Sequence, residues 1–238
     1  MIRNQTLTAI IPVRGGSKGI PGKNLYRLGR DTLLERTIKL AKACSYIDRV
    51  LVSTDHPEMH AIAKSHGAAT PTLRPAHLAS DTAKTVDVVL DVMQSAAVDS
   101  GYIVLLQVTS PLRTLTDLNS FCEQFDAADP SAQAIVSLVA HDSPHPDKIQ
   151  KIENGRVASY LGKESMVARQ LLPKVYQLNG AFYLTHRDVL LHQKTFMPAD
   201  TLPFIMPTER SLNLDQAQDI FLLEALLEKG RITVEEYE

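Results

Sequence analysis

Cationic and small side chains gather between Arg14 and Asn24, where they are suited to bind an anion. Arg14 carries a planar guanidinium that can hold an oxyanion through two parallel hydrogen bonds, while Lys18 and Lys23 carry compact, mobile charges. Glycine lets backbone N–H groups approach an anion closely, and Ser17 adds a hydroxyl donor. This composition fits the phosphates of a nucleoside triphosphate. The candidate binding residues of the loop are Arg14, Gly15, Gly16, Ser17, Lys18, Lys23 and Asn24.

Two familiar phosphate-binding motifs do not match this loop. A P-loop needs a Gly-Lys pair followed by Ser or Thr, with another glycine five residues before that pair's glycine. Here Asn24 follows Gly22 and Lys23, and Ser17 occupies the earlier position. The dinucleotide pattern G-x-G-x-x-G finds no frame in the loop either. The alternative to a phosphate site is a basic surface loop without a ligand.

Alternating strand and helix patterns occupy the first 140 or so residues, which predicts an α/β fold with a mostly parallel sheet covered by helices. The loop after the first strand then lies at the carboxyl edge of the sheet, where open α/β sheets bind ligands. We expect strands at 7–13, 49–55, 102–108, 134–140 and 177–186, and helices at 32–43, 58–66, 83–97, after 116, and at 215–229, with Asp31 or Thr32 and Gly230 at helix ends.

The pattern weakens between 141 and 204, which we interpret as an excursion from the main sheet. Prolines recur at 173, 198 and 203, and residues 149–160 are typical of a hairpin around Asn154-Gly155. Apolar groups such as Tyr176 and Phe196 look exposed there, and surface of this kind is often buried by a partner.

Polar side chains also end the strand at 102–108, where Gln107, Thr109 and Ser110 are placed to hydrogen-bond a base or a ribose. The simpler alternative is a polar turn stiffened by a proline. Similarly, Ser80 or Asp81 can cap the helix that follows them, and Asp215 can cap the final helix, so none of these needs a ligand to explain it.

Several of these segments resemble the acylneuraminate (CMP-sialic acid) synthetase family of cytidylyltransferases. The loop R-G-G-S-K-G-I-P-G-K-N at 14–24 is similar to the family's signature loop, and the likeness extends from Ile10 to about Ile220. The resemblance implies a three-layer, Rossmann-like sheet of the nucleotide-diphospho-sugar transferase type. It also implies one domain over 1–238 with an inserted arm at about 141–204 that forms a homodimer and reaches the neighbouring active site.

The resemblance assigns roles to residues in the matching blocks, which lie at 73–81, 105–113, 169–170, 179–183 and 211–215. It places Arg74 near the cytosine and lets Asp81, with Ser80, order the nucleotide loop. The implied catalytic residues are Arg14, Lys23 and Asp215, and the implied sugar-binding residues are Gln107, Thr109, Ser110, Lys148, Arg169, Gln170 and Asn179.

Three of the blocks depart from the family pattern. Val108 replaces a proline, and Gln177-Leu178 replace an Arg-Pro pair that commonly precedes Asn-Gly. In the metal motif D-[IL]-D, Asp215 matches the second acid but Asn213 stands at the first, offering a neutral amide oxygen. Magnesium (or manganese) is the implied cofactor, with Asp215 and Asn213 as its candidate ligands.

These features together predict transfer of CMP from CTP to the anomeric hydroxyl of a sialic-acid-type nonulosonic acid, with release of pyrophosphate. Positioning and electrostatics suffice for such chemistry without a covalent nucleophile. The alternatives are a cytidylyltransferase for legionaminic, pseudaminic or octulosonic acid, and a non-catalytic nucleotide-binding protein, which Asn213 makes conceivable. A glycosyltransferase on a related fold has no positive support.

Composition limits the remaining classes. With a net charge of −2, the chain has no basic field for nucleic acid and no polybasic face for a membrane. The N-terminal segment lacks the apolar core of a signal peptide, so we expect a cytosolic protein. Cys44 and Cys122 have neither disulfide-framework nor zinc spacing and are expected to be buried thiols. His141 and His145 are not expected to share a metal, because Pro144 between them opposes the helix that would bring them to one face.

Overall fold

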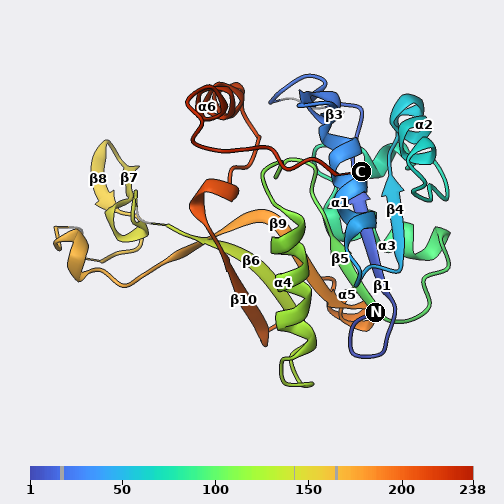
Figure 1. Ribbon diagram of the computed structural model, residues 1–238. Coiled ribbons are helices and arrows are strands. Elements are labelled where there is room, and N and C mark those ends of the chain that lie inside the picture. Colours follow the sequence, from blue (N-terminus) through green and yellow to red (C-terminus); the bar gives the residue numbers. More distant parts are fainter. Residues whose placement is uncertain (17–18, 142, 164–165, 238) are drawn as a thin grey trace.

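The computed structural model describes residues 1–16, 19–141, 143–163 and 166–237 (Figure 1). The predicted contacts of Ser17 and Lys18 therefore lie outside the described residues. A six-stranded sheet with the order β10-β6-β9-β5-β1-β4 forms the centre of the molecule. Its strands are β1 (Leu7–Pro12), β4 (Arg49–Ser53), β5 (Tyr102–Leu105), β6 (Ala134–Ala140), β9 (Tyr176–His186) and β10 (Thr201–Met206).

Strand direction in this sheet confirms the mostly parallel α/β fold. β1 pairs in parallel with β4 and with β5, and β10 pairs in parallel with β6. β9 runs antiparallel between β5 and β6. The loop that follows β1 and the polar segment that follows β5 consequently emerge at the same edge of the sheet.

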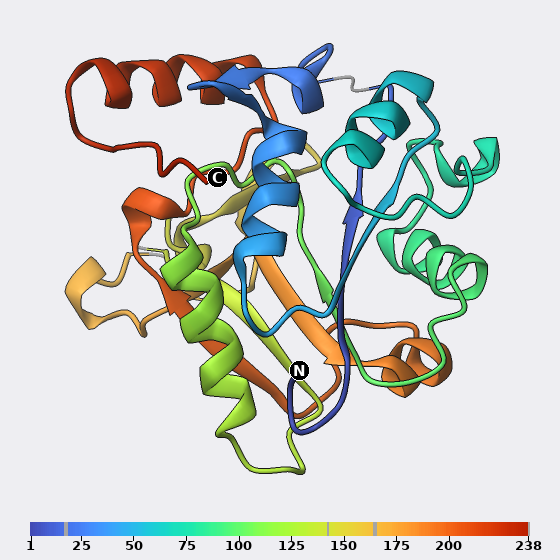
Figure 2. The same cartoon turned by 45° about the vertical axis from the view of Figure 1, so that its right-hand side comes forward.

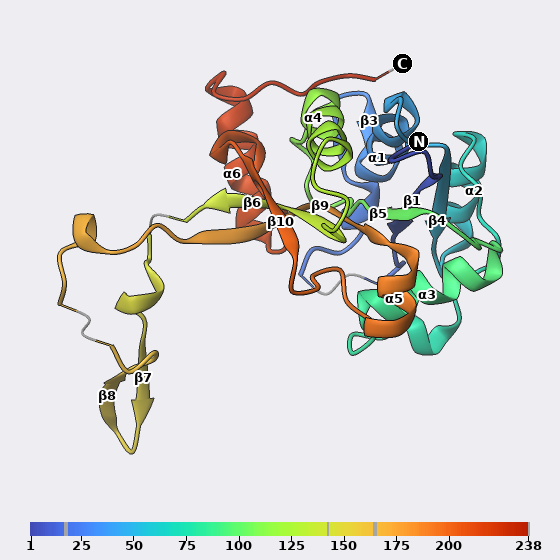
Figure 3. The same ribbon diagram turned by 90° about the horizontal axis from the view of Figure 1, so that it is seen from below.

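Helices cover both faces of the sheet and make it the middle of three layers. Figure 3 shows α1 and α4 on one side and α3 and α5 on the other. The alternation of side chains along β1 explains this, because Leu7, Ala9 and Ile11 join the core cluster under α1 and α4, whereas Ile10 joins the cluster under α3 and α5. The helices are α1 (Leu33–Ala43), α2 (Pro57–Ser65), α3 (Thr85–Ser95), α4 (Leu115–Asp126), α5 (Arg187–Gln193) and α6 (Ala217–Glu228).

Helix ends follow local capping chemistry, and two of the caps offered as simpler alternatives are excluded. Thr32 caps α1, as expected, in a reciprocal capping box with Glu35. Lys84 is the residue that precedes α3, so neither Ser80 nor Asp81 caps that helix. The final helix is likewise capped by Gln216, not by Asp215.

A hairpin arm leaves the body between β6 and β9 (Figures 1 and 3). It contains the antiparallel pair β7 (Gln150–Glu153) and β8 (Arg156–Ser159). Asn154 and Gly155 connect them with φ angles of 52° and 73°, which confirms the predicted hairpin turn. We call residues 141–175 the arm.

Residues 176–204 of the expected insertion belong to the body of the molecule. The strand predicted at 177–186 is β9, whereas α5 and β10 were not predicted. β10 contains Pro203, which argues against a central strand, but β10 lies at the edge of the sheet, where proline is tolerated.

The remaining elements are short. They are β2 (Arg27–Leu28), β3 (Asp31–Thr32), and the 3₁₀ turns η1 (Lys23–Leu25), η2 (Ala76–Leu78), η3 (Pro146–Lys148), η4 (Arg169–Leu171) and η5 (Thr208–Arg210).

Within the described part of the chain, no helix combines the length and apolar character needed to cross a bilayer. Cys44 and Cys122 are buried free thiols, as predicted. Figure 2 shows α1 and α4 in front of the strands.

Candidate active site

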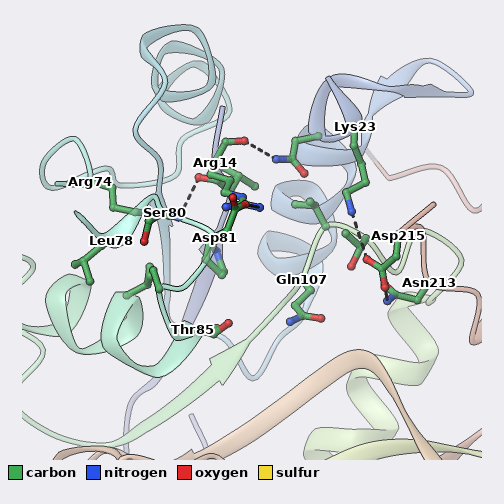
Figure 4. Close-up of a pocket in the computed structure, with 17 residues that line it drawn as sticks. Arg14, Lys23, Arg74, Leu78, Ser80, Asp81, Thr85, Gln107, Asn213 and Asp215 are labelled. Carbon is green, nitrogen blue, oxygen red and sulfur yellow. Dashed lines mark hydrogen bonds and ion pairs between the residues drawn. The ribbon is translucent and has the colours of Figure 1, made fainter. Parts of the chain in front are cut away.

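A cleft of about 400 Å³ opens at the carboxyl ends of β1 and β5. Four segments of the chain form its walls: the loop after β1, the turn before α3, the segment after β5 and the segment before α6 (Figure 4). The structure brings together these predicted site residues around the cleft: Arg14, Lys23, Asn24, Arg74, Ser80, Asp81, Gln107, Thr109, Asn213 and Asp215.

Hydrogen bonds hold the described part of the loop after β1 in place. The Asn24 amide donates to the Arg14 carbonyl at 2.9 Å, which closes the loop on itself. The Gly15 N–H donates to the Asp55 carboxylate at 2.9 Å and so ties the loop to the end of β4. Gly22 has a φ of 68°, a conformation that favours glycine. Asp55 was not predicted as part of this site, although it also follows a strand.

Lys23 connects the loop to the segment before α6. Its Nζ donates to the Leu214 carbonyl at 2.7 Å and lies 3.4 Å from Asp215 Oδ1. The loop also passes against the backbone here, because a Cβ added to Gly19 would lie 2.0 Å from the Asp215 carbonyl oxygen. A candidate phosphate-binding cation and a candidate metal carboxylate thus share one side of the cleft.

Asp215 and Asn213 are compatible with a magnesium ion that is shared with a substrate. The Asn213 amide donates to Asp215 Oδ2 at 2.6 Å, and the buried Asn213 Oδ1 has no hydrogen-bond partner among the residues that the structure describes. Among the described residues, no group of three or more His, Cys, Asp or Glu side chains is arranged to hold a metal. Mg²⁺ commonly binds through one or two protein oxygens together with substrate phosphates, so this donor set fits that mode and not an all-protein cage.

Arg14 faces the cleft from the opposite side. Its Nη2 lies 2.9 Å from Asp81 Oδ1, and its Nη1 donates to the Ala79 carbonyl at 3.4 Å (Figure 4). Asp81 therefore fixes the orientation of the guanidinium at the cleft wall. The Ser80 hydroxyl instead donates to the His77 carbonyl, within the same turn.

Arg74 lies deeper, at the junction of β1 and β4. Its Nη2 donates to the carbonyls of Val13 and Ser53 at 2.9 and 2.6 Å, and its Nε donates to Ser53 Oγ at 3.0 Å. Burial lowers the pKa of this guanidinium from its ordinary value. Arg74 thus joins two strand ends and also lines the cleft, while its contact with cytosine stays a prediction.

Behind the segment that follows β5, a buried polar network supports the cleft. Gln107 and Thr109 line the cleft, whereas the buried Ser110 hydroxyl donates to the Asn179 carbonyl at 3.2 Å. Asn179 is also buried, and its Oδ1 accepts from Ser137 Oγ at 2.6 Å while its Nδ2 donates to Ser211 Oγ at 3.0 Å. Ser110 and Asn179 therefore lie behind the lining residues, not among them.

The remaining predicted sugar-binding residues lie on the arm. Arg169 and Gln170 line a separate cavity of about 640 Å³ at the base of the arm. The Lys148 ammonium donates to the Val167 carbonyl, also within the arm. The structure does not bring these three side chains to the cleft of their own chain.

The wall formed by the start of α3 was missed in the sequence. Leu78, Thr85 and Val88 line the cleft beside Arg74. Thr85 and Val88 are three residues apart and so share one face of the first turn of α3, a spacing that identifies the face but not what it faces. Leu78 and Val88 give this part of the cleft an apolar lining.

A glycine-rich cationic loop at the carboxyl edge of a mostly parallel three-layer sheet defines a nucleotide-binding α/β enzyme. Solved structures share the fold. A CMP:2-keto-3-deoxy-manno-octonic acid synthetase complexed with CTP superposes with a TM-score of 0.68 at 16% identity, covering 94% of this chain and 99% of that one. A 4-diphosphocytidyl-2C-methyl-D-erythritol synthase gives a TM-score of 0.64, also at 16% identity, with 94% and 99% covered.

The sequence profile described as Cytidylyltransferase matches residues 8–234. The chain belongs to this family and is a nucleotidyltransferase. It is 30% identical to the N-acylneuraminate cytidylyltransferase of Escherichia coli over 94% of this chain, spanning about half (52%) of that protein. It is 29% identical to the CMP-N,N'-diacetyllegionaminic acid synthase of Legionella pneumophila (93% of this chain, 96% of that one) and 27% identical to post-translational flagellin modification protein B of Campylobacter coli (95% and 97%).

Proposed function

We propose that this chain transfers CMP from CTP to the anomeric hydroxyl of a sialic-acid-type nonulosonic acid and releases pyrophosphate. The observation that carries the proposal is the convergence of Arg14, Lys23 and Asp215 on one cleft in a member of the cytidylyltransferase family. Relatives named for sialic, legionaminic and pseudaminic acids support a sugar acid as the acceptor.

The reaction needs charge stabilisation more than covalent chemistry. The anomeric hydroxyl oxygen attacks the α-phosphorus, and the bond from that phosphorus to the bridging oxygen breaks, so pyrophosphate leaves with the electron pair. The hydroxyl proton passes to solvent. Arg14 and Lys23 face the cleft from opposite walls and stabilise the negative charge that builds up on the departing phosphates.

Magnesium (or manganese) is part of this proposal. Asp215 would hold it, and the Asn213 amide oxygen is the second candidate donor. When bound, the cation would neutralise charge on the triphosphate as pyrophosphate departs. Lys23, which lies 3.4 Å from Asp215 Oδ1, keeps that carboxylate at the phosphate side of the cleft.

A homodimer formed through the arm completes the proposal. Large apolar side chains on the arm are exposed, including Ile152 at 79%, Val157 at 74% and Leu171 at 75%. Apolar surface of this extent favours burial by a second copy. The arm would then bring Lys148, Arg169 and Gln170 to the sugar site of the partner, where an arginine fork suits the carboxylate of the sugar acid. The proposed enzyme is cytosolic.

Pyrophosphate release measured with CTP, Mg²⁺ and a panel of sugar acids tests this function. Release with N-acetylneuraminate, and loss of release without the metal, is the expected result. Release only with legionaminic acid would establish the second candidate. The 29% identity to the Legionella protein supports that candidate nearly as well as the 30% identity to the Escherichia coli protein supports the first. CTP binding without release from any acid in the panel would overturn a catalytic role.

A further inference from the structure

An ion pair lies just outside the cleft. It joins α4, which follows the segment after β5, to η5, which precedes the segment before α6. Arg210 donates from Nε to Asp117 Oδ2 and from Nη2 to Asp117 Oδ1, both at 2.8 Å. The side chain of Asp117 is only 5% exposed. A two-pronged contact of this kind fixes distance and orientation together, which a single hydrogen bond does not.

Asp117 is anchored to the wall that follows β5. It lies in the first turn of α4, and its Oδ2 also accepts from the Thr114 N–H at 3.0 Å and from the Thr114 hydroxyl at 2.9 Å. Burial alone would raise the pKa of this carboxyl, but the bonds from Arg210 and Thr114 hold it below its ordinary value. Thr114 comes five residues after Thr109, which lines the cleft, so Asp117 is rigidly placed relative to that wall.

Arg210 immediately precedes the segment that leads to the candidate metal ligand, and Ser211 beside it accepts a hydrogen bond from Asn179 Nδ2 at 3.0 Å. Arg210 ends η5, and residues 211–216 between η5 and α6 form neither helix nor strand. The Leu214 N–H donates to the Thr109 carbonyl at 2.8 Å, and Lys23 donates to the Leu214 carbonyl. Segment 211–216 is thus held near its end by Leu214 and at its start by Arg210.

We propose that the Arg210–Asp117 ion pair positions the Asp215 carboxylate in the cleft, a role that rests on the proposed function. Neither Arg210 nor Asp117 lines the cleft, and Arg210 instead lines a separate hollow beside Glu209 and Arg231. The pair is therefore a positioning device and not a catalytic one. It acts by fixing the position of segment 211–216 relative to the segment that follows β5. Thr109 in the one segment and Asp215 in the other both line the cleft.

Loss of the two-pronged contact between Arg210 and Asp117 should loosen segment 211–216 while the rest of the cleft stays intact. A displacement of about 1 Å in a catalytic group can lower a rate by about a hundredfold. Arg210→Gln keeps most of the side chain's length and polarity but removes the charge and the fork. Arg210→Lys keeps the charge without the fork, so it should recover part of the loss.

The matched control is Arg187→Gln. Arg187 is also partly buried, contacts the carboxylate of Asp188 at 3.0 Å and donates to the Val98 carbonyl at 2.8 Å, but it lies at the opposite edge of the sheet. Its substitution removes a single-pronged ion pair to a carboxylate that is 55% exposed, together with one backbone contact, so it controls for the loss of an arginine elsewhere in the fold. It should leave segment 211–216 unchanged.

Three measurements test the proposal: hydrogen exchange of the 211–216 amides in the ligand-free protein, Mn²⁺ binding to the protein–CTP complex by electron paramagnetic resonance, and the Mg²⁺ dependence of pyrophosphate release. For Arg210→Gln we expect faster exchange at Leu214, Mn²⁺ binding weakened by about tenfold, and kcat lowered by about 10- to 100-fold. The KM for CTP should change much less, because Arg14 and Lys23 remain in place.

Unchanged exchange at 211–216 in Arg210→Gln would overturn the proposal, as would equal effects in Arg187→Gln. The exchange experiment needs no substrate, so it separates this proposal from the proposed function. A wild-type protein that releases no pyrophosphate with any sugar acid would refute the function, while faster exchange in Arg210→Gln alone would still support the positioning of the segment.

Discussion

The cleft and the arm are built in opposite ways. Around the cleft, polar side chains such as Arg74 and Asn179 are buried and bonded to backbone or to other side chains of the same chain. On the described part of the arm, β7 and β8 form a two-stranded sheet, and apolar side chains such as Ile152 and Val157 are exposed. The cleft is therefore held by contacts within one chain, whereas the arm presents exposed apolar side chains.

The two regions are therefore held in place by different kinds of contact. A two-stranded hairpin alone is marginally stable in water, so the arm depends on what covers it. The cleft walls are fixed by a sheet with two buried faces and by contacts between segments far apart in sequence, such as the hydrogen bond from Leu214 to Thr109. We therefore expect substitutions in the cleft to affect nucleotide transfer and substitutions on the arm to affect recognition of the sugar.

The largest effect is expected for Lys23→Ala. This change removes the cation that links the phosphate loop to Asp215, and losing one such stabilising group costs about 10²- to 10³-fold in kcat. Pyrophosphate release under saturating CTP and Mg²⁺ measures it. Lys84→Ala, which changes a cation beside α3 that does not line the cleft, is the control. Turnover of Lys23→Ala within a fewfold of wild type would remove Lys23 from the mechanism.

Asn179→Ala distinguishes a supporting residue from a sugar-binding one. The buried amide bonds to Ser137 and Ser211, so its loss should lower the free energy of unfolding by about 2–3 kcal/mol. We expect the KM for the sugar acid to change little in the folded fraction. Urea unfolding and steady-state kinetics measure the two quantities, and Asn119→Ala on α4 is the matched amide control. A large rise in KM with unchanged stability would place Asn179 in the sugar site instead.

Arg169→Ala tests whether the arm recognises the acceptor. If Arg169 binds the carboxylate of the sugar acid, the KM for that acid should rise by about tenfold or more, while the KM for CTP is unchanged. Lys151→Ala, which alters a cation paired with Glu153 on the hairpin, serves as the comparison. Equal changes in both KM values would mean that the arm acts on the cleft as a whole.

Paired substitution of Ile152 and Val157 by serine tests the dimer. The two residues are partners across β7 and β8, and both side chains are exposed. Removing this apolar area should weaken self-association by about tenfold, given roughly 25 cal/mol for each Å² no longer buried. Analytical ultracentrifugation over a concentration series measures the change, with Arg156→Ser as the control. A monomeric wild-type protein would exclude the proposed assembly.

Local patterns allowed most of the fold to be predicted. The strand at 134–140 has the expected bounds because it is short, apolar and flanked by turns. The pattern gave no sign of α5, which has only seven residues, and Pro203 hid the edge strand β10. Capping, the simpler alternative for Asp81 and Asp215, is excluded, and both carboxylates instead contact cations that line the cleft.

The site was predictable where its residues are contiguous and was not where the fold assembles it. The loop from Arg14 to Asn24 carries its chemistry in one stretch and could be recognised directly. Arg210 and Asp117 are 93 positions apart, and their meeting depends on how β10 and α4 pack. No local spacing encodes such a contact, so only the folded chain reveals it.

The arm enters and leaves the body at adjacent positions. Ala140 at the end of β6 is the register partner of Tyr176 at the start of β9, and the His141 N–H bonds to the Val175 carbonyl at 2.9 Å. The insertion therefore closes a loop whose ends are already joined by the sheet. Segment 141–175 is thus modular: it can be lengthened, shortened or exchanged with that of a relative while strand register is kept. Under the proposed function, changes confined to this segment would alter recognition of the sugar acid and leave the cleft unchanged.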